Sequence, residues 1–311
     1  MNLPFYTHRQ SMIDTYGEPL YRVPIDPGFG CPHRGPVGEG GCTFCPPDGS
    51  RAGYTANAGT LEEQIAQGMA FARARYGAGR FLAYIQAFTG TFAPASRQRQ
   101  LYLRLLDAFP FEAVSIGTRP DCLPESTMDV LCRLRERLDV WVELGIQTVH
   151  DRTLEHIRRG HDWTAGREAI LRLHERGIHV AVHVILGLPG ETRDDFSRTA
   201  DTLAGLPVEG IKIHNLHVVR GAAMEREFET SPFPVYDERT YSEILIDFIR
   251  RLPPKVVIMR INTDTPPDRL IAPVWEMPKG RFRDFVISEM NRQGYRQGDA
   301  VTEVSGLGRR S

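Results

Sequence analysis

Residues 140–186 read VWVELGIQTVHDRTLEHIRRGHDWTAGREAILRLHERGIHVAVHVIL. The stretch begins with an apolar, β-branched run at 140–146 and ends with another at 179–186. Between these runs lie two segments with the 3.6-residue periodicity of amphipathic helices, at 151–159 and 165–176. A strand, helical segments and a second strand form one βα unit, whose strands pair in parallel. The stretch therefore predicts an α/β protein.

The same alternation extends along most of the chain. Apolar runs typical of strands occur at 20–26, 81–88, 112–117, 140–146, 179–186 and 210–219. Helical patterns between or after them lie at 61–77, 97–109, 127–138, 192–205, 241–252 and 281–294, and a seventh apolar run lies at 255–261. Repeated βα units build a closed barrel or an open sheet, and periodicity does not choose between them. In both architectures the chemistry lies at the carboxyl ends of the strands.

Composition excludes several classes of protein. The formal net charge of −1 gives no overall basic field of the kind that nucleic-acid-binding proteins carry. No run of eighteen apolar residues exists, so we expect no membrane contact. The odd count of five cysteines and the absence of an apolar leader argue against a disulfide framework. We expect a cytoplasmic protein with reduced, chemically active thiols.

Three of the five cysteines lie in one glycine-rich loop directly after the first expected strand. The segment CPHRGPVGEGGCTFC contains Cys31, Cys42 and Cys45. Glycines allow the backbone to fold tightly around a bound group, and three soft ligands favour zinc or an iron–sulfur cluster. Structural zinc needs four ligands, and His33 is the candidate fourth, although it follows Cys31 by only two residues. A three-cysteine cluster would instead leave one iron open for chemistry.

The loop resembles the cluster loop of radical SAM enzymes, in a long-spaced variant with an aromatic residue, Phe44, before the last cysteine. The resemblance continues through SIGTRPDCL, VELGIQTVHDRTLEHIRRGH, VHVILGLPGET and KIHNLHVVRG, in that order. These segments are similar to the YhcC-like family of bacterial radical SAM proteins. Members of that family are relatives of the radical SAM domain in the Elongator catalytic subunit.

The resemblance implies a fold and a chemistry. The fold is a partial (β/α)6 TIM-like barrel over residues 1–219, with an α/β extension over 220–311 packed on it. Cys31, Cys42 and Cys45 are implied to bind three irons of a [4Fe–4S] cluster, and S-adenosylmethionine (SAM) to chelate the fourth. One electron then cleaves SAM to a 5′-deoxyadenosyl radical, which takes a hydrogen atom from the substrate. The electron is implied to come from a donor of the flavodoxin or ferredoxin type.

The family pattern also implies which residues contact SAM. Gln86 and Thr89, after the second strand, correspond to the segment that faces the methionyl amino group. Phe44 lies beside the cluster ligands. Leu186 and Gly187, at the end of the fifth strand, correspond to the adenine face, where glycine permits close backbone approach.

Polar residues on the third and fourth strands complete the expected contacts. Ser115, Glu143 and Gln147 lie toward the ends of these strands, with Gln147 expected near the ribose and Arg159 near the SAM carboxylate. A glutamate in an apolar strand needs a partner to offset its desolvation. We expect Arg119 or an arginine of IRRGH to be that partner, either at the cofactor or in a structural salt bridge.

The remaining candidates are less specific. Cys122 and Cys132 are too few for an auxiliary cluster, and Cys122 is expected to be a buried small residue rather than a hydrogen donor. His214 and His217 have opposite parity on the sixth strand, so one of them should face the barrel interior with His183.

The resemblance says least about the substrate. The Elongator relationship points to a wobble uridine of tRNA, with Arg260, Lys279, Arg281 and Arg283 as candidate phosphate contacts and Trp275 as a stacking surface. A metabolite or peptide substrate is the first alternative. A zinc-stabilised, non-catalytic binding protein is the second.

Overall fold

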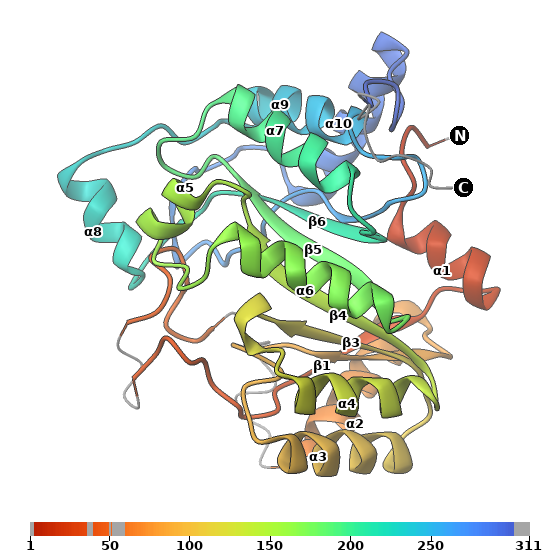
Figure 1. The fold of residues 1–311 in the computed structure, drawn as a ribbon. Coiled ribbons are helices and arrows are strands. Elements are labelled where there is room, and N and C mark those ends of the chain that lie inside the picture. The colour runs from red at the N-terminus through yellow and green to blue at the C-terminus, as the bar shows by residue number, and fades with distance from the viewer. Residues whose placement is uncertain (1–2, 36–39, 50, 52–59, 302–311) are drawn as a thin grey trace, which may run out of the picture.

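A curled sheet of seven parallel strands forms the centre of the protein, in the order β1-β2-β3-β4-β5-β6-β8 (Figure 1). The computed structural model describes residues 3–35, 40–49, 51 and 60–301. The strands of the sheet are β1 (Tyr21–Ile25), β2 (Phe81–Ile85), β3 (Phe111–Thr118), β4 (Asp139–Gln147), β5 (His179–Leu186), β6 (Gly210–Asn215) and β8 (Val257–Arg260). The predicted α/β class with a partial barrel is confirmed, and β8 adds a seventh strand to it.

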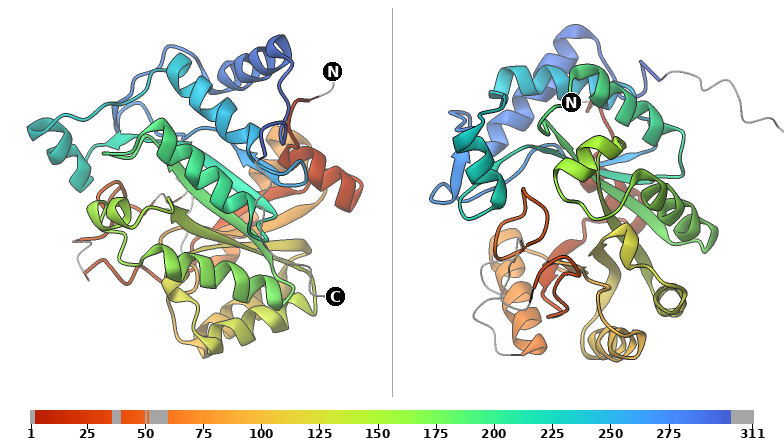
Figure 2. Two further views of the ribbon diagram at one scale, coloured as in Figure 1. Left: turned by 45° about the horizontal axis from the view of Figure 1, so that its top comes forward. Right: turned by 60° about the vertical axis from the view of Figure 1, so that its left-hand side comes forward.

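Helices cover the outer face of this sheet, as the two views of Figure 2 show. The helices after β1 are α2 (Leu61–Tyr76), α3 (Ala95–Ala108), α4 (Glu125–Arg135), α5 (Asp151–His156), α6 (Trp163–Glu175), α7 (Arg193–Ala204), α8 (Ala223–Thr230), α9 (Glu238–Arg250) and α10 (Lys279–Gln293), with a 3-10 turn, η2 (Pro120–Cys122). Of these, α8 lies to one side of the sheet beside β7, and α10 packs on α9 (Figure 1). The main apolar core lies between these helices and the strands. Strands covered on both faces read as nearly continuous apolar runs, which is why the sequence pattern found them.

Local sequence explains where several helices begin. The side chain of Thr60 accepts a hydrogen bond from the backbone N–H of Glu63, whose carboxylate accepts one from the Thr60 backbone. Thr192 and Asp195 form the same reciprocal pair at the start of α7. Each pair satisfies two backbone donors that the first helical turn leaves free.

The apolar run 210–219 is not one strand, in contrast to the prediction. β6 ends at Asn215, because the main-chain and side-chain oxygens of Asn215 accept hydrogen bonds from Thr263 (2.6 and 2.8 Å). A separate two-stranded sheet follows, in which β7 (Val218–Val219) pairs antiparallel with β9 (Leu270–Ala272). His217 therefore lies beyond the strand and hydrogen-bonds Thr265, so the parity argument decides only for His214.

The amino-terminal end of the barrel is closed by α1 (His8–Tyr16), a helix that the sequence pattern did not predict. Met12 packs there against Leu82, Tyr84 and Ala113, which face the barrel interior. Thr7 also pairs with Ile258 at the free edge of β8. Access to the interior from this end is thereby narrowed. None of the helices in the described ranges is long and apolar enough to cross a membrane.

Candidate active site

The cysteine loop follows β1 and lies against the carboxyl end of β2. The backbone N–H of Thr89 donates to the carbonyl of Gly30 (3.0 Å), and that of Phe88 donates to the carbonyl of Gly49 (3.3 Å). Gly30 adopts the left-handed conformation that glycine favours, with φ of +72°. The loop thus occupies the edge of the sheet where an α/β protein carries its chemistry.

Two sets of contacts hold the cysteine segment itself. The Arg34 guanidinium donates to the carbonyl oxygens of Cys45 (3.0 Å) and Pro46 (2.7 Å), which wraps it around the turn. On the other side, the N–H of Thr43 donates to the carbonyl of Ile157, and its carbonyl accepts from Met224. Contacts from both directions fix the backbone on which the thiols stand.

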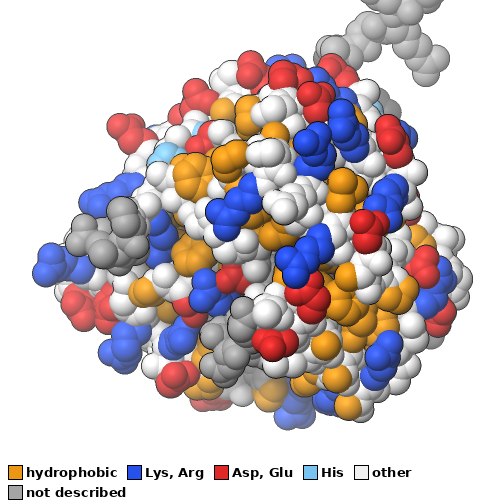
Figure 3. Space-filling model, turned by 90° about the horizontal axis from the view of Figure 1, so that it is seen from below, with side chains coloured by type: hydrophobic (Ala, Val, Ile, Leu, Met, Phe, Trp, Pro, Cys, Tyr) orange, Lys and Arg blue, Asp and Glu red, His pale blue; other side chains and the backbone are white. Residues whose placement is uncertain are grey.

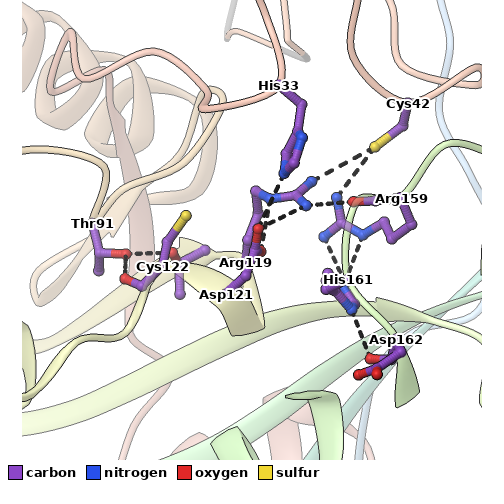
Figure 4. Close-up of polar contacts among 11 residues, drawn as sticks. His33, Cys42, Thr91, Arg119, Asp121, Cys122, Arg159, His161 and Asp162 are labelled. Carbon is purple, nitrogen blue, oxygen red and sulfur yellow. Dashed lines mark hydrogen bonds and ion pairs between the residues drawn. The ribbon is translucent and has the colours of Figure 1, made fainter. Parts of the chain in front are cut away.

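Two arginines point at the buried thiol of Cys42 (Figure 4). Nη1 of Arg159 lies 3.3 Å from Cys42 Sγ, and Nη1 of Arg119 lies 3.7 Å from it. Arg119 also pairs with Asp121 and donates to the carbonyl of Arg159. A neutral thiol is a weak acceptor, whereas a thiolate attracts two guanidinium groups. The arrangement therefore suits a cysteine that binds metal as a thiolate.

The end of β4 is shaped around Arg159. Its guanidinium donates to the carbonyl of Gly145 (2.6 and 3.1 Å). A Cβ atom on Gly145 would lie 2.5 Å from Arg159 Nη2 and 2.8 Å from Gln147 Nε2, so a larger residue there would displace the ends of both side chains. Gln147 has a φ of +73°, which is strained for a residue with a side chain. Gln147 and Arg159 are thus brought together beside Cys42.

The three thiols of the loop act on one another electrostatically. Burial raises the pKa of Cys45; Arg34 opposes this rise, and the nearby Cys42 and Cys31 add to it. Within the described ranges, no three His, Cys, Asp or Glu side chains are close enough to hold one metal ion. A [4Fe–4S] cluster needs a wider set, because each thiolate binds a different iron. His33, the candidate fourth zinc ligand, pairs instead with Asp121 (3.1 Å).

Other expected SAM contacts lie at the same edge of the sheet or just outside the barrel. Gln86 directly follows β2 and is half-buried, and Thr89 is buried against the cysteine loop. Phe44 packs in an apolar cluster with Ile185. Leu186 faces the core between sheet and helices, so Ile185 is the residue that points inward. A Cβ on Gly187 would lie 3.2 Å from the Tyr236 ring.

Ser115 and Glu143 lie deeper, within the barrel, and bond to each other (2.8 Å). Glu143 accepts further hydrogen bonds from Tyr84 (2.9 Å) and His183 (2.8 Å), and forms an ion pair with Lys212. The prediction that an arginine is the partner of Glu143 is therefore wrong. Lys212 takes that place, and Arg119 pairs with Asp121 instead. The polar atoms of Ser115 and Glu143 find their partners inside this network.

The network sets the charges at the centre of the barrel. Burial alone would raise the pKa of Glu143, but the charge of Lys212 and the hydrogen bond from His183 hold it well below its usual value. Burial lowers the pKa of His183 to about 4, so its imidazole is neutral near pH 7. His183 Nε2–H then donates to the Glu143 carboxylate.

Tyr84 and Lys212 belong to this site although the sequence pattern did not indicate them. Both stand in apolar strands at interior-facing positions, and Lys212 is one of only three lysines in the chain. The available signal was a lone glutamate on β4 and a lone lysine on β6, both at interior positions of strands that flank β5. Neither position alone indicates that the two side chains meet.

Cys122 is the last residue of η2, which follows Arg119 in the chain. The carbonyl of Cys122 accepts a hydrogen bond from the Thr91 hydroxyl (Figure 4). Burial raises the pKa of its thiol to about 12, so the group stays protonated at neutral pH. Cys132 lies on α4.

The expected nucleic-acid contacts in the extension differ in their surroundings. Trp275 packs against Tyr241 and Phe282, and its indole N–H donates to the Tyr236 carbonyl, so the ring is not a free stacking surface. Arg281 and Arg283 are exposed, and Arg283 pairs with Asp284. The side chain of Lys279 lies outside the described part of the structure.

Comparison with known proteins agrees with this architecture. Residues 25–203 match the family model of the Radical SAM superfamily, and residues 208–292 match that of the Radical_SAM C-terminal domain. The chain is 36% identical to YtqA of Bacillus subtilis (strain 168) over 295 residues, covering 94% of this chain and 92% of YtqA. It is 36% identical to YhcC of Escherichia coli (strain K12) over 263 residues, covering 84% of each chain.

Two more distant similarities involve proteins of which this chain matches only a part. It is 29% identical over 154 residues to the tRNA uridine(34) acetyltransferase of Dehalococcoides mccartyi (strain CBDB1), covering 49% of this chain and 33% of the relative. The solved structure of Methanocaldococcus infernus Elp3 superposes with a TM-score of 0.70 at 19% identity, covering 89% of this chain and 64% of that one. The second similarity concerns the fold alone.

The fold and the family match define a radical SAM enzyme. The chain belongs to the Radical SAM superfamily and is similar to YhcC and YtqA. Its cofactors are a [4Fe–4S] cluster and SAM, and it needs a reductant, as the family does. The alternative of a zinc-stabilised binding protein is thereby set aside.

Proposed function

We propose that Cys31, Cys42 and Cys45 hold the cluster, and that the enzyme modifies a uridine of tRNA. With cluster and SAM bound, the site supplies a 5′-deoxyadenosyl radical that removes a hydrogen atom from the substrate. The observation that carries the site is the pair of guanidinium groups directed at Cys42 Sγ. Three thiolates would leave one iron of a [4Fe–4S] cluster without a protein ligand, and this iron would be open to SAM.

The surrounding residues of this chain hold the cofactors and keep water out. Arg119 and Arg159 offset the negative charge of the ligated thiolates. Phe44 and its apolar neighbours limit the access of water to the radical. The contacts of Arg34 and Thr43 fix the loop that carries the ligands.

SAM is proposed to lie across the carboxyl ends of the first strands. Gln86 and Thr89 would accept hydrogen bonds from the methionyl amino group, and Gln147 would bond the ribose. Arg159 would contact the carboxylate, and the backbone at Gly187 would contact the adenine. The proximity of Gln147 and Arg159 beside Cys42 supports this assignment.

Replacing Arg159 by glutamine will lower the midpoint potential of the cluster, measured without SAM by an anaerobic redox titration. The guanidinium stabilises the more negative, reduced state. A difference of about 1 kcal/mol between the two states corresponds to about 40 mV for one electron. Arg158→Gln, at the exposed neighbouring position, is the control and should leave the potential unchanged. Equal potentials for Arg159→Gln and wild type would remove Arg159 from the surroundings of the cluster.

The tRNA substrate is supported by the similarity to a tRNA uridine(34) acetyltransferase. A broad basic field is not part of the proposal, because the net charge is −1 and charges of both signs are interspersed on the face in Figure 3. Recognition would therefore rest on local contacts, with exposed Arg281 among them. A small flavodoxin or ferredoxin is the proposed electron donor.

Two measurements test the proposal. Protein reconstituted anaerobically with iron and sulfide should form 5′-deoxyadenosine from SAM when dithionite is added, as detected by mass spectrometry. A fully loaded cluster that forms none would contradict the assigned chemistry. Nucleosides from the tRNA of a deletion strain should lack one modified uridine that returns on complementation. Identical nucleoside profiles would exclude tRNA and favour a metabolite or peptide.

A further inference from the structure

The interior of the barrel below the cysteine loop carries an excess of positive charge. Lys212 is buried and pairs with Glu143. Arg22 also contacts the Tyr84 ring, whose centroid lies 4.4 Å from Lys212 Nζ and 5.6 Å from the Arg22 guanidinium carbon. One carboxylate thus faces more than one cation. Burial without a counter-charge is costly, so such a site favours an anion.

Arg260 adds a third cation from the last strand of the sheet. The pairing of β6 with β8 shifts register after Ile211, and the shift brings Arg260 opposite Lys212. The charge of Arg260 acts on Lys212, His183 and His214, lowering the pKa of each, although burial is the larger cause. Within the described ranges, Arg260 has neither a hydrogen-bond acceptor nor an ion-pair partner.

The barrel interior is partly exposed toward the carboxyl ends of its strands. On β5 and β6, the residues that face the interior near the strand ends, His183 and His214, are partly exposed, whereas their outward-facing neighbours are buried. The side chain of His183 keeps 23% of its surface exposed. The two rings lie 5.5 Å apart, and burial keeps His214 neutral. His214 has no polar partner within the described ranges and can donate an N–H.

Arg260 also borders a cavity of about 1140 Å³ between the N-terminal segment, β8 and α10. His8 and Arg9 line the same cavity. Asp284 of α10 also lines this cavity, and its carboxylate pairs with Arg283. Arg260 is therefore half-buried, reachable and without a counter-ion among the described side chains.

We propose that the barrel interior between β5, β6 and β8 binds an oxyanion of the substrate, a phosphate or a carboxylate, through Arg260 and His214 beside Lys212. This inference rests on the proposed function, because a radical formed at the strand ends reacts only with a group held close to it. The oxyanion then anchors the substrate at one end while its reacting carbon lies nearer the cysteine loop.

Binding of three probes to the full-length protein tests the proposal: inorganic phosphate, uridine 5′-monophosphate and succinate. The protein carries its cluster and saturating SAM without reductant, so that the SAM carboxylate is already bound. Titration calorimetry should detect binding of at least one probe. Binding of phosphate and the nucleotide alone identifies a phosphate group, and binding of succinate alone identifies a carboxylate. Absence of binding by all three overturns the proposal.

Variants assign the binding to Arg260. Arg260→Gln should weaken binding on the order of tenfold to a hundredfold, and Arg260→Lys should weaken it less. Arg133→Gln, on the outer helix α4, is the matched control and should bind as the wild type does. Equal affinity of Arg260→Gln and wild type contradicts the assignment.

A wild-type measurement guards against a variant that does not fold. The binding probe should raise the melting temperature above that in chloride of equal ionic strength, since it binds only the native state. No rise would count against the site. If the wild type cleaves SAM but binds none of the probes, the oxyanion site is excluded and the radical chemistry stands. If it binds a probe but does not cleave SAM, the oxyanion site stands and the proposed radical chemistry is contradicted.

Discussion

Replacing Cys42 by serine will abolish the formation of 5′-deoxyadenosine, with a loss of at least about a hundredfold. Cys42 is the most buried of the three loop cysteines, and both arginines at the site point at its sulfur. Loss of a ligand costs more than the 10-fold to 100-fold loss that follows removal of a group behind the ligand. The measurement is iron and sulfide content after reconstitution, followed by mass spectrometry of the SAM products.

Cys132→Ser is the matched control for this prediction. Cys132 lies half-buried on α4, and its replacement should leave both cluster content and SAM cleavage at the level of the wild type. A Cys42→Ser protein that binds four irons and cleaves SAM normally would exclude Cys42 as a ligand. Equal damage from Cys132→Ser would point to a general defect in folding.

Replacing Lys212 by methionine will lower the free energy of unfolding by about 3–5 kcal/mol, the usual cost of removing one partner from a buried ion pair. The Glu143 carboxylate, fully buried, then loses the charge that holds its pKa low. Denaturation in urea, followed by circular dichroism, measures the change. The loss arises because the remaining carboxylate must stay buried without its cation or take up a proton.

The double variant Glu143→Gln/Lys212→Met distinguishes the cost of an unpaired charge from the cost of altered packing. Removing both charges leaves no unpaired ion, so the double variant should be more stable than Lys212→Met alone. Glu289→Gln, which breaks the exposed pair with Arg292, should change stability little. A double variant less stable than Lys212→Met would contradict the account of Glu143 as the stranded charge.

Much of the fold could be read from local pattern. Strands covered by helices on one face and packed around the barrel on the other are mostly apolar, as 140–146 and 179–186 are apart from interior-facing Glu143 and His183. The exceptions depend on distant partners. Hydrogen bonds from Thr263 end β6 at Asn215, and α1 is held by packing of Met12 against the barrel.

The candidate site divides in the same way. The cysteine spacing and the glycines around it predicted a loop for zinc or an iron–sulfur cluster directly after the first strand, and the loop follows β1. The partner of Glu143 could not be predicted, because the arginines near it in sequence and Lys212, 69 residues away, were equally possible. Likewise, strand parity decides that Ile185 rather than Leu186 faces inward. A one-residue error in the assumed register exchanges the inward and outward faces.

The sequence by itself determined the class of this protein: repeated βα units, a parallel sheet and three cysteines on the loop after the first strand. These features are local, since each depends on residues that are neighbours along the chain. Only the tertiary structure decided which charges meet inside the barrel, where Glu143 pairs with Lys212 and Arg260 stands opposite Lys212 without a counter-ion among the described residues. Curling of the sheet brings side chains from separate strands into one interior, and the electrostatic cost of burial then selects their partners.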